Sequence, residues 1–117
     1  MPHIPRLMNL YFTRTYERAI RKLLADDARA EMEAAIVAAP DAAPVIRGTG
    51  GIRKLRWAGS GRGKRGGIRA IYFWHTGPGA IYVLTAYAKA DRDDLSPADR
   101  RALVRVVATI EQERGEG

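Results

Sequence analysis

The sequence predicts an α+β fold in which helices pack on one face of an antiparallel sheet. Three observations predict it. Apolar residues recur every three or four positions in the first third of the 117-residue chain, which is helical spacing. Three strand-like runs separated by glycine-rich turns follow, and a serine–proline start precedes a last helical stretch. With 46% hydrophobic residues, residues 1–117 are expected to form one domain.

The elements before the first glycine cluster are short. Residues 7–12 (LMNLYF) are compatible with a first strand, although the start of a helix fits the same residues. Thr13 can cap the helix that follows, because its hydroxyl can accept a hydrogen bond from an amide of the first turn. A second helix is expected over residues 29–38, after two aspartates that favour the positive end of the helix dipole and before Pro40. The two helices are expected to form an antiparallel hairpin.

The second half of the chain predicts three strands and a helix. The strands are expected at residues 52–58, 68–75 and 80–88, and the third is the most apolar, which favours a central position. Residues 59–67 (GSGRGKRGG) have the composition of a hairpin tip. A helix is expected from Ser96 to about residue 115, with a hydroxyl cap followed by proline. The order is therefore strand, helix, helix, three antiparallel strands, helix.

The positive charge of the chain is concentrated between Ala42 and Ala90. The whole chain has 20 Lys or Arg and 13 Asp or Glu, a net charge of +7. The central block has no Asp or Glu, and its cations are Arg47, Arg53, Lys54, Arg56, Arg62, Lys64, Arg65, Arg69 and Lys89. Because cations that neutralise phosphates release condensed counterions, this segregation predicts a polyanionic partner.

The strands of this block carry the strongest candidates for phosphate contacts. Lys54 and Arg56 are two residues apart in a strand, so both point to one face, and Arg69 lies on the adjacent strand. Tyr87 and Lys89 are also two apart, at the end of the last strand. The alternatives are cations extended into solvent and a core tyrosine.

Three further motifs have more than one interpretation. The glycine-rich tip could clamp a sugar–phosphate chain or only keep the sheet edge soluble; its cations are Arg62, Lys64 and Arg65. The glycines at 48, 50 and 51 suggest a phosphate loop, but they lack the following Lys-Ser/Thr and precede a strand, so a connecting loop is favoured. The acidic group at 91, 93 and 94 can cap the sheet edge, balance the cations or orient a catalytic lysine.

The composition also excludes several classes of chemistry. With no cysteine, the chain cannot use a catalytic thiol, cysteine-bound zinc or an iron–sulfur cluster. Two histidines, His3 and His75, leave little imidazole for acid–base catalysis or metal binding, so neither a metal nor a cofactor is expected. No apolar run approaches the ~20 residues of a membrane span, and residues 1–10 do not resemble a secretory signal. We therefore expect a soluble cytoplasmic protein.

From Gly48 onward the chain resembles a known toxin family. The runs GTGGIRKLRWAGSGRGKRGGIRAIYFW and IYVLTAYAKADRDDLSPADRRAL are similar to the RelE/HigB toxins of type II toxin–antitoxin modules. They are most similar to the HigB-like branch, with its G-T-G-G-[IL]-R-K-[LV]-R-W signature and A-Y-x-K-x-x-x-x-D-L tail. The resemblance implies the microbial ribonuclease-type fold of RelE, ribosome-dependent cleavage of messenger RNA and a helix-turn-helix, HigA-like antitoxin as partner.

The resemblance also implies roles for individual residues. It places Lys54 and Arg56 on the strand that holds catalytic lysines, Arg69 at the scissile phosphate and Lys89 at a second phosphate-stabilising position. Tyr87 is a candidate for positioning the nucleophile or stacking on a base, while Arg53 and the three tip cations are candidate RNA contacts. The chain lacks the C-terminal tyrosine of RelE and the histidines of related HigB proteins. Lys54 is therefore the candidate general base, because cationic neighbours favour a neutral amine.

Two other classes of function remain open at this point. ParE-like relatives share the fold and inhibit DNA gyrase without nuclease chemistry. A non-catalytic RNA-binding module would use the same basic face only to hold phosphates, with a steep dependence of binding on salt.

Overall fold

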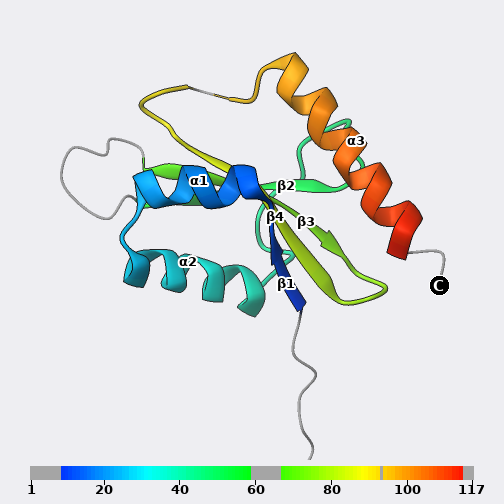
Figure 1. The fold of residues 1–117 in the computed structure, drawn as a ribbon, viewed down its shortest axis with the longest axis horizontal. Helices are drawn as coiled ribbons and strands as arrows, with labels where there is room; N and C mark the ends of the chain where they lie inside the picture. Colours follow the sequence, from blue (N-terminus) through cyan, green and yellow to red (C-terminus); the bar gives the residue numbers. More distant parts are fainter. Residues whose placement is uncertain (1–8, 59–66, 93, 115–117) are drawn as a thin grey trace, which may run out of the picture.

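A computed structural model of the chain describes residues 9–58, 67–92 and 94–114. The elements, in chain order, are β1 (Asn9–Phe12), α1 (Arg14–Leu23), α2 (Asp26–Ala38), β2 (Ile52–Trp57), β3 (Ile68–His75), β4 (Ala80–Ala88) and α3 (Pro97–Arg114). Figure 1 shows the helical hairpin α1–α2 and the helix α3 arranged around the sheet. The α+β class and the order of elements predicted from the sequence are confirmed.

The sheet has the strand order β1-β4-β3-β2, so the most apolar strand is central, as predicted. The strands β2, β3 and β4 pair antiparallel, as expected for strands joined by hairpins. The prediction of a fully antiparallel sheet is wrong for β1, which pairs parallel with β4. No tight turn joins these two strands, so nothing in their connection requires opposite directions.

The helices cover both faces of the sheet, which corrects the prediction of a single covered face. On one face α1 and α2 pack through Tyr16, Ile20, Met32 and Ile36, all of which are buried. On the other face Val107 of α3 packs with side chains from all three antiparallel strands. The physical reason lies in β3, whose first six residues are all buried, so apolar side chains point to both faces and each face needs a cover.

Hydroxyl side chains cap the starts of two of the helices. The Thr13 hydroxyl accepts a hydrogen bond from the backbone N–H of Tyr16 at 3.0 Å and donates to the carbonyl of Leu84 at 2.6 Å, so it caps α1 and ties it to β4. The Ser96 hydroxyl accepts from the N–H of Asp99 at 3.0 Å, which confirms the predicted start of α3. The helix α2 begins at Asp26, earlier than predicted, because both aspartates fall inside its first turn.

The glycine cluster before β2 is a hydrogen-bonded turn. Thr49 is 2% exposed; its hydroxyl donates to the carbonyl of Ile46 at 2.6 Å and accepts from the N–H of Ile52 at 3.1 Å. Gly48 and Gly50 both have φ of 78°, a conformation that favours glycine. The interpretation as a connecting loop, in preference to a phosphate loop, agrees with this internal bonding.

Buried tyrosines make the stability of the fold sensitive to alkaline pH. Burial, reinforced by the carboxylate of Glu33 that accepts a hydrogen bond from the hydroxyl at 2.7 Å, raises the pKa of Tyr16. Burial also raises the pKa of Tyr72, whose hydroxyl donates to the carbonyl of Pro40. Below pH ~10 the folded and unfolded chains are both protonated at these groups, so this stability is fully present.

We expect the free energy of unfolding to fall as pH rises above ~10, because the unfolded chain then loses protons that the folded chain retains. Each such tyrosine contributes up to about 1.4 kcal/mol per pH unit to this slope. Urea unfolding between pH 8 and 11 measures it. Tyr16→Phe should make the slope shallower, and an unchanged slope in that variant would contradict the assignment.

Candidate functional site

Three of the predicted site residues form one row across the sheet. Arg56 on β2 is paired with Arg69 on β3, and Arg69 is paired with Tyr87 on β4. Residues that are directly opposite in adjacent strands point to the same face, so the three side chains lie side by side. Ile71 and Phe73 lie two and four residues after Arg69 on β3, so their side chains point to the same face as that of Arg69. Both belong to the apolar cluster that includes Val107 of α3, so the three residues lie on the face that α3 covers farther along the strands.

Lys54 and Lys89 extend this row at its two sides. Lys54 lies two residues before Arg56 on β2, on the same face, and its side chain is 23% exposed. Lys89 lies two residues beyond Tyr87, and its backbone N–H donates to the carbonyl of Gly67 at 3.0 Å, so the pairing of β4 with the β3 side continues to this residue. The row is therefore a cationic site at the end of the sheet, and we call these five residues the basic row.

Arg53, another predicted RNA contact, does not join the basic row. Arg53 alternates to the opposite face, and its guanidinium donates to the carbonyls of Asp41 at 3.1 Å and Ala43 at 2.6 Å. Arg53 thereby connects the segment after α2 to β2. Its position in the strand predicts the face on which it lies but not this structural role. The three cations of the glycine-rich tip lie outside the described residues: Arg62, Lys64 and Arg65.

The centre of the basic row is buried. Arg69 is 6% exposed and donates to the carbonyl of Ile68 at 3.2 Å. Tyr87 is 7% exposed, and the guanidinium carbon of Arg92 lies 5.5 Å from the centre of its ring. Burial, followed by the charge of Asp94, raises the pKa of the Tyr87 phenol, while Arg69 and Arg92 act in the opposite direction. At neutral pH the hydroxyl of Tyr87 is protonated and can donate a hydrogen bond.

Among the described residues, the Tyr87 hydroxyl has no hydrogen-bond partner although it is fully enclosed. A buried hydroxyl without a hydrogen-bond partner lowers stability. A protein that keeps such a group usually does so for another reason, such as ligand binding or catalysis.

The connection between β4 and α3 brings Asp94, one of the acidic residues with several possible roles in the sequence, to the basic row, together with Arg100, which the sequence did not indicate. Asp94 lies 3.3 Å from the ammonium of Lys54 and 3.9 Å from the guanidinium of Arg100. Its pKa is lowered, first by the N–H of Leu95 and then by the two cations. Of the three roles that the sequence left open for the acidic group, Asp94 therefore has contacts that suit balancing a cation or orienting a lysine.

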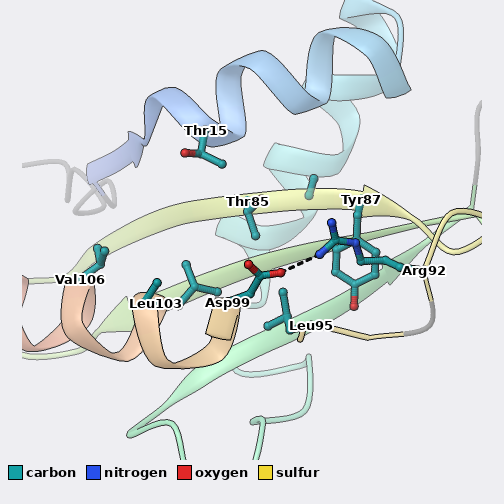
Figure 2. A pocket seen from close by; sticks show the side chains of 10 residues that line it. Thr15, Thr85, Tyr87, Arg92, Leu95, Asp99, Leu103 and Val106 are labelled. Atoms are coloured by element: carbon teal, nitrogen blue, oxygen red, sulfur yellow. Dashed lines mark hydrogen bonds and ion pairs between the residues drawn. The ribbon is translucent and has the colours of Figure 1, made fainter. Parts of the chain in front are cut away.

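A cavity of about 370 Å³ adjoins Tyr87. Figure 2 shows Tyr87 and Thr85 on β4 at its floor, Thr15 of α1 on one side and the α3 residues on the other. Arg92 and Asp99 form an ion pair at 2.8 Å across it. The remaining lining is mostly apolar: Ala86, Leu95, Ala102, Leu103 and Val106.

The chemistry that the site offers is electrostatic. Three cations on neighbouring strands, with a phenol that donates a hydrogen bond, suit a phosphate group or an oxygen on which negative charge develops. In the part of the chain that the structure describes, no three His, Asp or Glu gather as metal ligands. In the same part, no helix is long and apolar enough to span a membrane.

Two solved structures from one bacterial toxin–antitoxin system have a similar fold. A mutant of Escherichia coli RelE in the free state matches with a TM-score of 0.55 and 17% sequence identity, over 75% of this chain and 90% of that chain. The intact E. coli RelBE toxin–antitoxin complex matches with a TM-score of 0.51 and 18% identity, over 69% of this chain and 95% of that chain.

The sequence itself matches a family. The model of the family described as "RelE toxin of RelE / RelB toxin-antitoxin system" matches residues 8–116, nearly the whole chain. The resemblance found in the residues from Gly48 onward is thereby confirmed at the level of the family. This protein therefore belongs to the RelE toxin family of toxin–antitoxin systems.

Proposed function

We propose that this toxin is a ribosome-dependent messenger-RNA endoribonuclease of the HigB-like branch. The observation that carries the proposal is the row of Arg56, Arg69 and Tyr87 on three neighbouring strands, in direct register. Cations fixed in this way suit a phosphate whose charge increases during a reaction, because they need no rearrangement as that charge develops.

The proposed reaction uses the RNA's own nucleophile. The 2′-hydroxyl releases its proton to solvent water as its oxygen attacks the adjacent phosphorus. The bond to the 5′-oxygen then breaks, this oxygen takes a proton from Lys54, and the products are a 2′,3′-cyclic phosphate and a 5′-hydroxyl. Arg69, Arg56 and Lys89 would stabilise the negative charge on the phosphorane and hold the groups in line.

Lys54 and Tyr87 would assist proton transfer to the leaving oxygen and the alignment of the reacting group. Lys54, whose side-chain nitrogen lies 3.3 Å from a carboxylate oxygen of Asp94, would donate a proton to the leaving 5′-oxygen, in place of the general-base role that the sequence suggested. The buried phenol of Tyr87 would donate a hydrogen bond to the reacting group. No step in this scheme uses a metal ion.

The proposal includes a partner and a cellular location. RelE of E. coli is seen in a complex with its antitoxin, and we propose that this toxin likewise binds a small antitoxin, of the helix-turn-helix, HigA-like kind, in the cytoplasm. The basic row would be active on mRNA at the ribosome once the antitoxin is absent.

Two assays of the purified full-length protein test the function. Incubation with ribosomes translating a reporter transcript should produce defined cleavage sites by primer extension, with 2′,3′-cyclic phosphate ends. DNA gyrase supercoiling should be unaffected. Intact transcripts together with inhibited gyrase would instead establish the ParE-like activity, and salt-dependent RNA binding without cleavage would establish a non-catalytic module.

A further inference from the structure

Asp94 joins three parts of the molecule that meet at the basic row. Its Oδ1 accepts a hydrogen bond from the backbone N–H of Leu95 at 2.8 Å and from the ammonium of Lys54 at 3.3 Å. Its Oδ2 lies 3.9 Å from the guanidinium of Arg100. The carboxylate therefore links β2, the connection after β4 and the first turns of α3, and the short bond to Leu95 fixes one of its oxygens in place.

Lys54 is a member of the basic row whose position such a contact can fix. Its ammonium stands on a flexible four-carbon stem, and 23% of the side chain is exposed. In the described residues Asp94 is the anion that contacts it. Arg69, by contrast, is enclosed and held by its surroundings, with 6% exposed.

We propose that Asp94 is a positioning residue of the RNA-cleaving site, which orients the ammonium of Lys54 toward the reacting phosphate. This inference rests on the proposed function. The fixed oxygen of Asp94 sets the place of the ammonium, and Lys54 in turn contacts the substrate. The field of the carboxylate extends across the sheet, since it also contributes to the raised pKa of Tyr87.

A carboxylate in this place has two effects of opposite sign. It orients Lys54, which increases the cleavage rate, and it repels RNA phosphates from a basic surface, which weakens binding. A residue with only a structural role would not combine these effects, because loss of folding lowers binding and cleavage together. The combination of tighter binding with slower cleavage therefore identifies a positioning residue.

Asp94→Asn in the full-length protein tests the inference, since the asparagine keeps an oxygen for the N–H of Leu95 but replaces the ion pair with Lys54 by a weaker hydrogen bond to a neutral amide. Binding is measured with a single-stranded RNA oligonucleotide carrying 2′-fluoro sugars, which has phosphates but no attacking hydroxyl. Cleavage is measured in a single turnover on translating ribosomes. We expect binding to tighten by about threefold and the cleavage rate to fall by about tenfold. An unchanged or faster rate would overturn the inference.

Asp91→Asn is the matched control. Asp91 lies on the same connection, is exposed, and has no ion pair within the described residues, so this variant changes the charge equally without touching Lys54. Binding should tighten similarly while the cleavage rate stays unchanged. A tenfold loss of rate in Asp91→Asn would show that net charge, and not the contact with Lys54, is responsible.

A double-mutant cycle shows whether Asp94 acts through Lys54. In a Lys54→Met background, Asp94→Asn should cause no further loss of cleavage rate. Equal losses in both backgrounds would contradict the positioning role. If Lys54→Met cleaves normally, the proposed role of Lys54 fails with it; if Lys54→Met is impaired and Asp94→Asn is not, only the present inference fails.

Discussion

Replacing Arg69 with alanine is expected to lower the rate of transcript cleavage by about 100- to 1,000-fold, the usual effect of removing one preorganised donor to a developing oxyanion. Arg69 is the middle member of the row, between Arg56 and Tyr87, so it has a charged or polar neighbour on both adjacent strands. Because the side chain is 6% exposed, its guanidinium is held before the substrate arrives. Single-turnover cleavage on translating ribosomes, followed by primer extension, measures the effect.

The burial of Arg69 requires a control for folding. Arg69→Met removes the charge but fills similar space, so it should lose cleavage as alanine does while its thermal unfolding midpoint stays closer to that of the parent protein. Arg47→Ala is the matched control for charge, since Arg47 belongs to the same basic block but is exposed and outside the row. A folded Arg69→Met variant that still cleaves transcripts would refute the proposed site.

Local signals in the sequence predicted the elements well because each is set by neighbouring residues. Thr13 caps α1 and Ser96 caps α3 by accepting a hydrogen bond from the backbone N–H three residues later. Such short-range contacts can be predicted from the sequence alone. The direction of β1 and the face covered by α3 could not be read in this way. The direction of β1 depends on its pairing with β4, about 70 residues away, and the face covered by α3 depends on the burial of β3 on both sides. Neither leaves a local pattern in the sequence.

The same difference applies to the candidate site. Strand alternation placed Lys54 and Arg56 on one face and Arg53 on the other, as the structure has them, yet Arg53 was included among the RNA contacts because charge alone does not distinguish its carbonyl partners. The direct pairing of Arg69 with Tyr87 depends on the register of two strands, and the irregularity in pairing between Ile71 and Tyr72 prevents that register from being counted from the turn.

The contact of Asp94 with Lys54 joins residues 40 positions apart. The sequence suggested such a contact as one of three possibilities for the acidic group, but it could not select the aspartate or the lysine. Pairs of this kind become visible only when the connection after β4 is placed beside β2.

Replacing Tyr87 with phenylalanine is expected to slow cleavage by about 100-fold while leaving the fold as stable as before or slightly more stable. The hydroxyl is enclosed and has no hydrogen-bond partner in the described part of the chain, so it does not contribute to stability through such a bond. Removing a buried, unpaired hydroxyl relieves a desolvation cost on the order of 1 kcal/mol. The loss of rate follows from the loss of a proton-bearing donor at the reacting group.

Two measurements on the same protein preparation separate these effects. Urea unfolding at pH 7 should give a free energy of unfolding equal to or above that of the parent protein, and single-turnover cleavage should show the loss of rate. Tyr82→Phe is the matched control, because Tyr82 lies on the same strand and on the α3 side of the sheet but is outside the basic row. A Tyr87→Phe variant that is clearly destabilised would mean that the hydroxyl serves the fold, and one that cleaves at the parent rate would remove Tyr87 from the site. The expected result, a hydroxyl that lowers stability and increases the rate, would mark Tyr87 as a residue kept for its function.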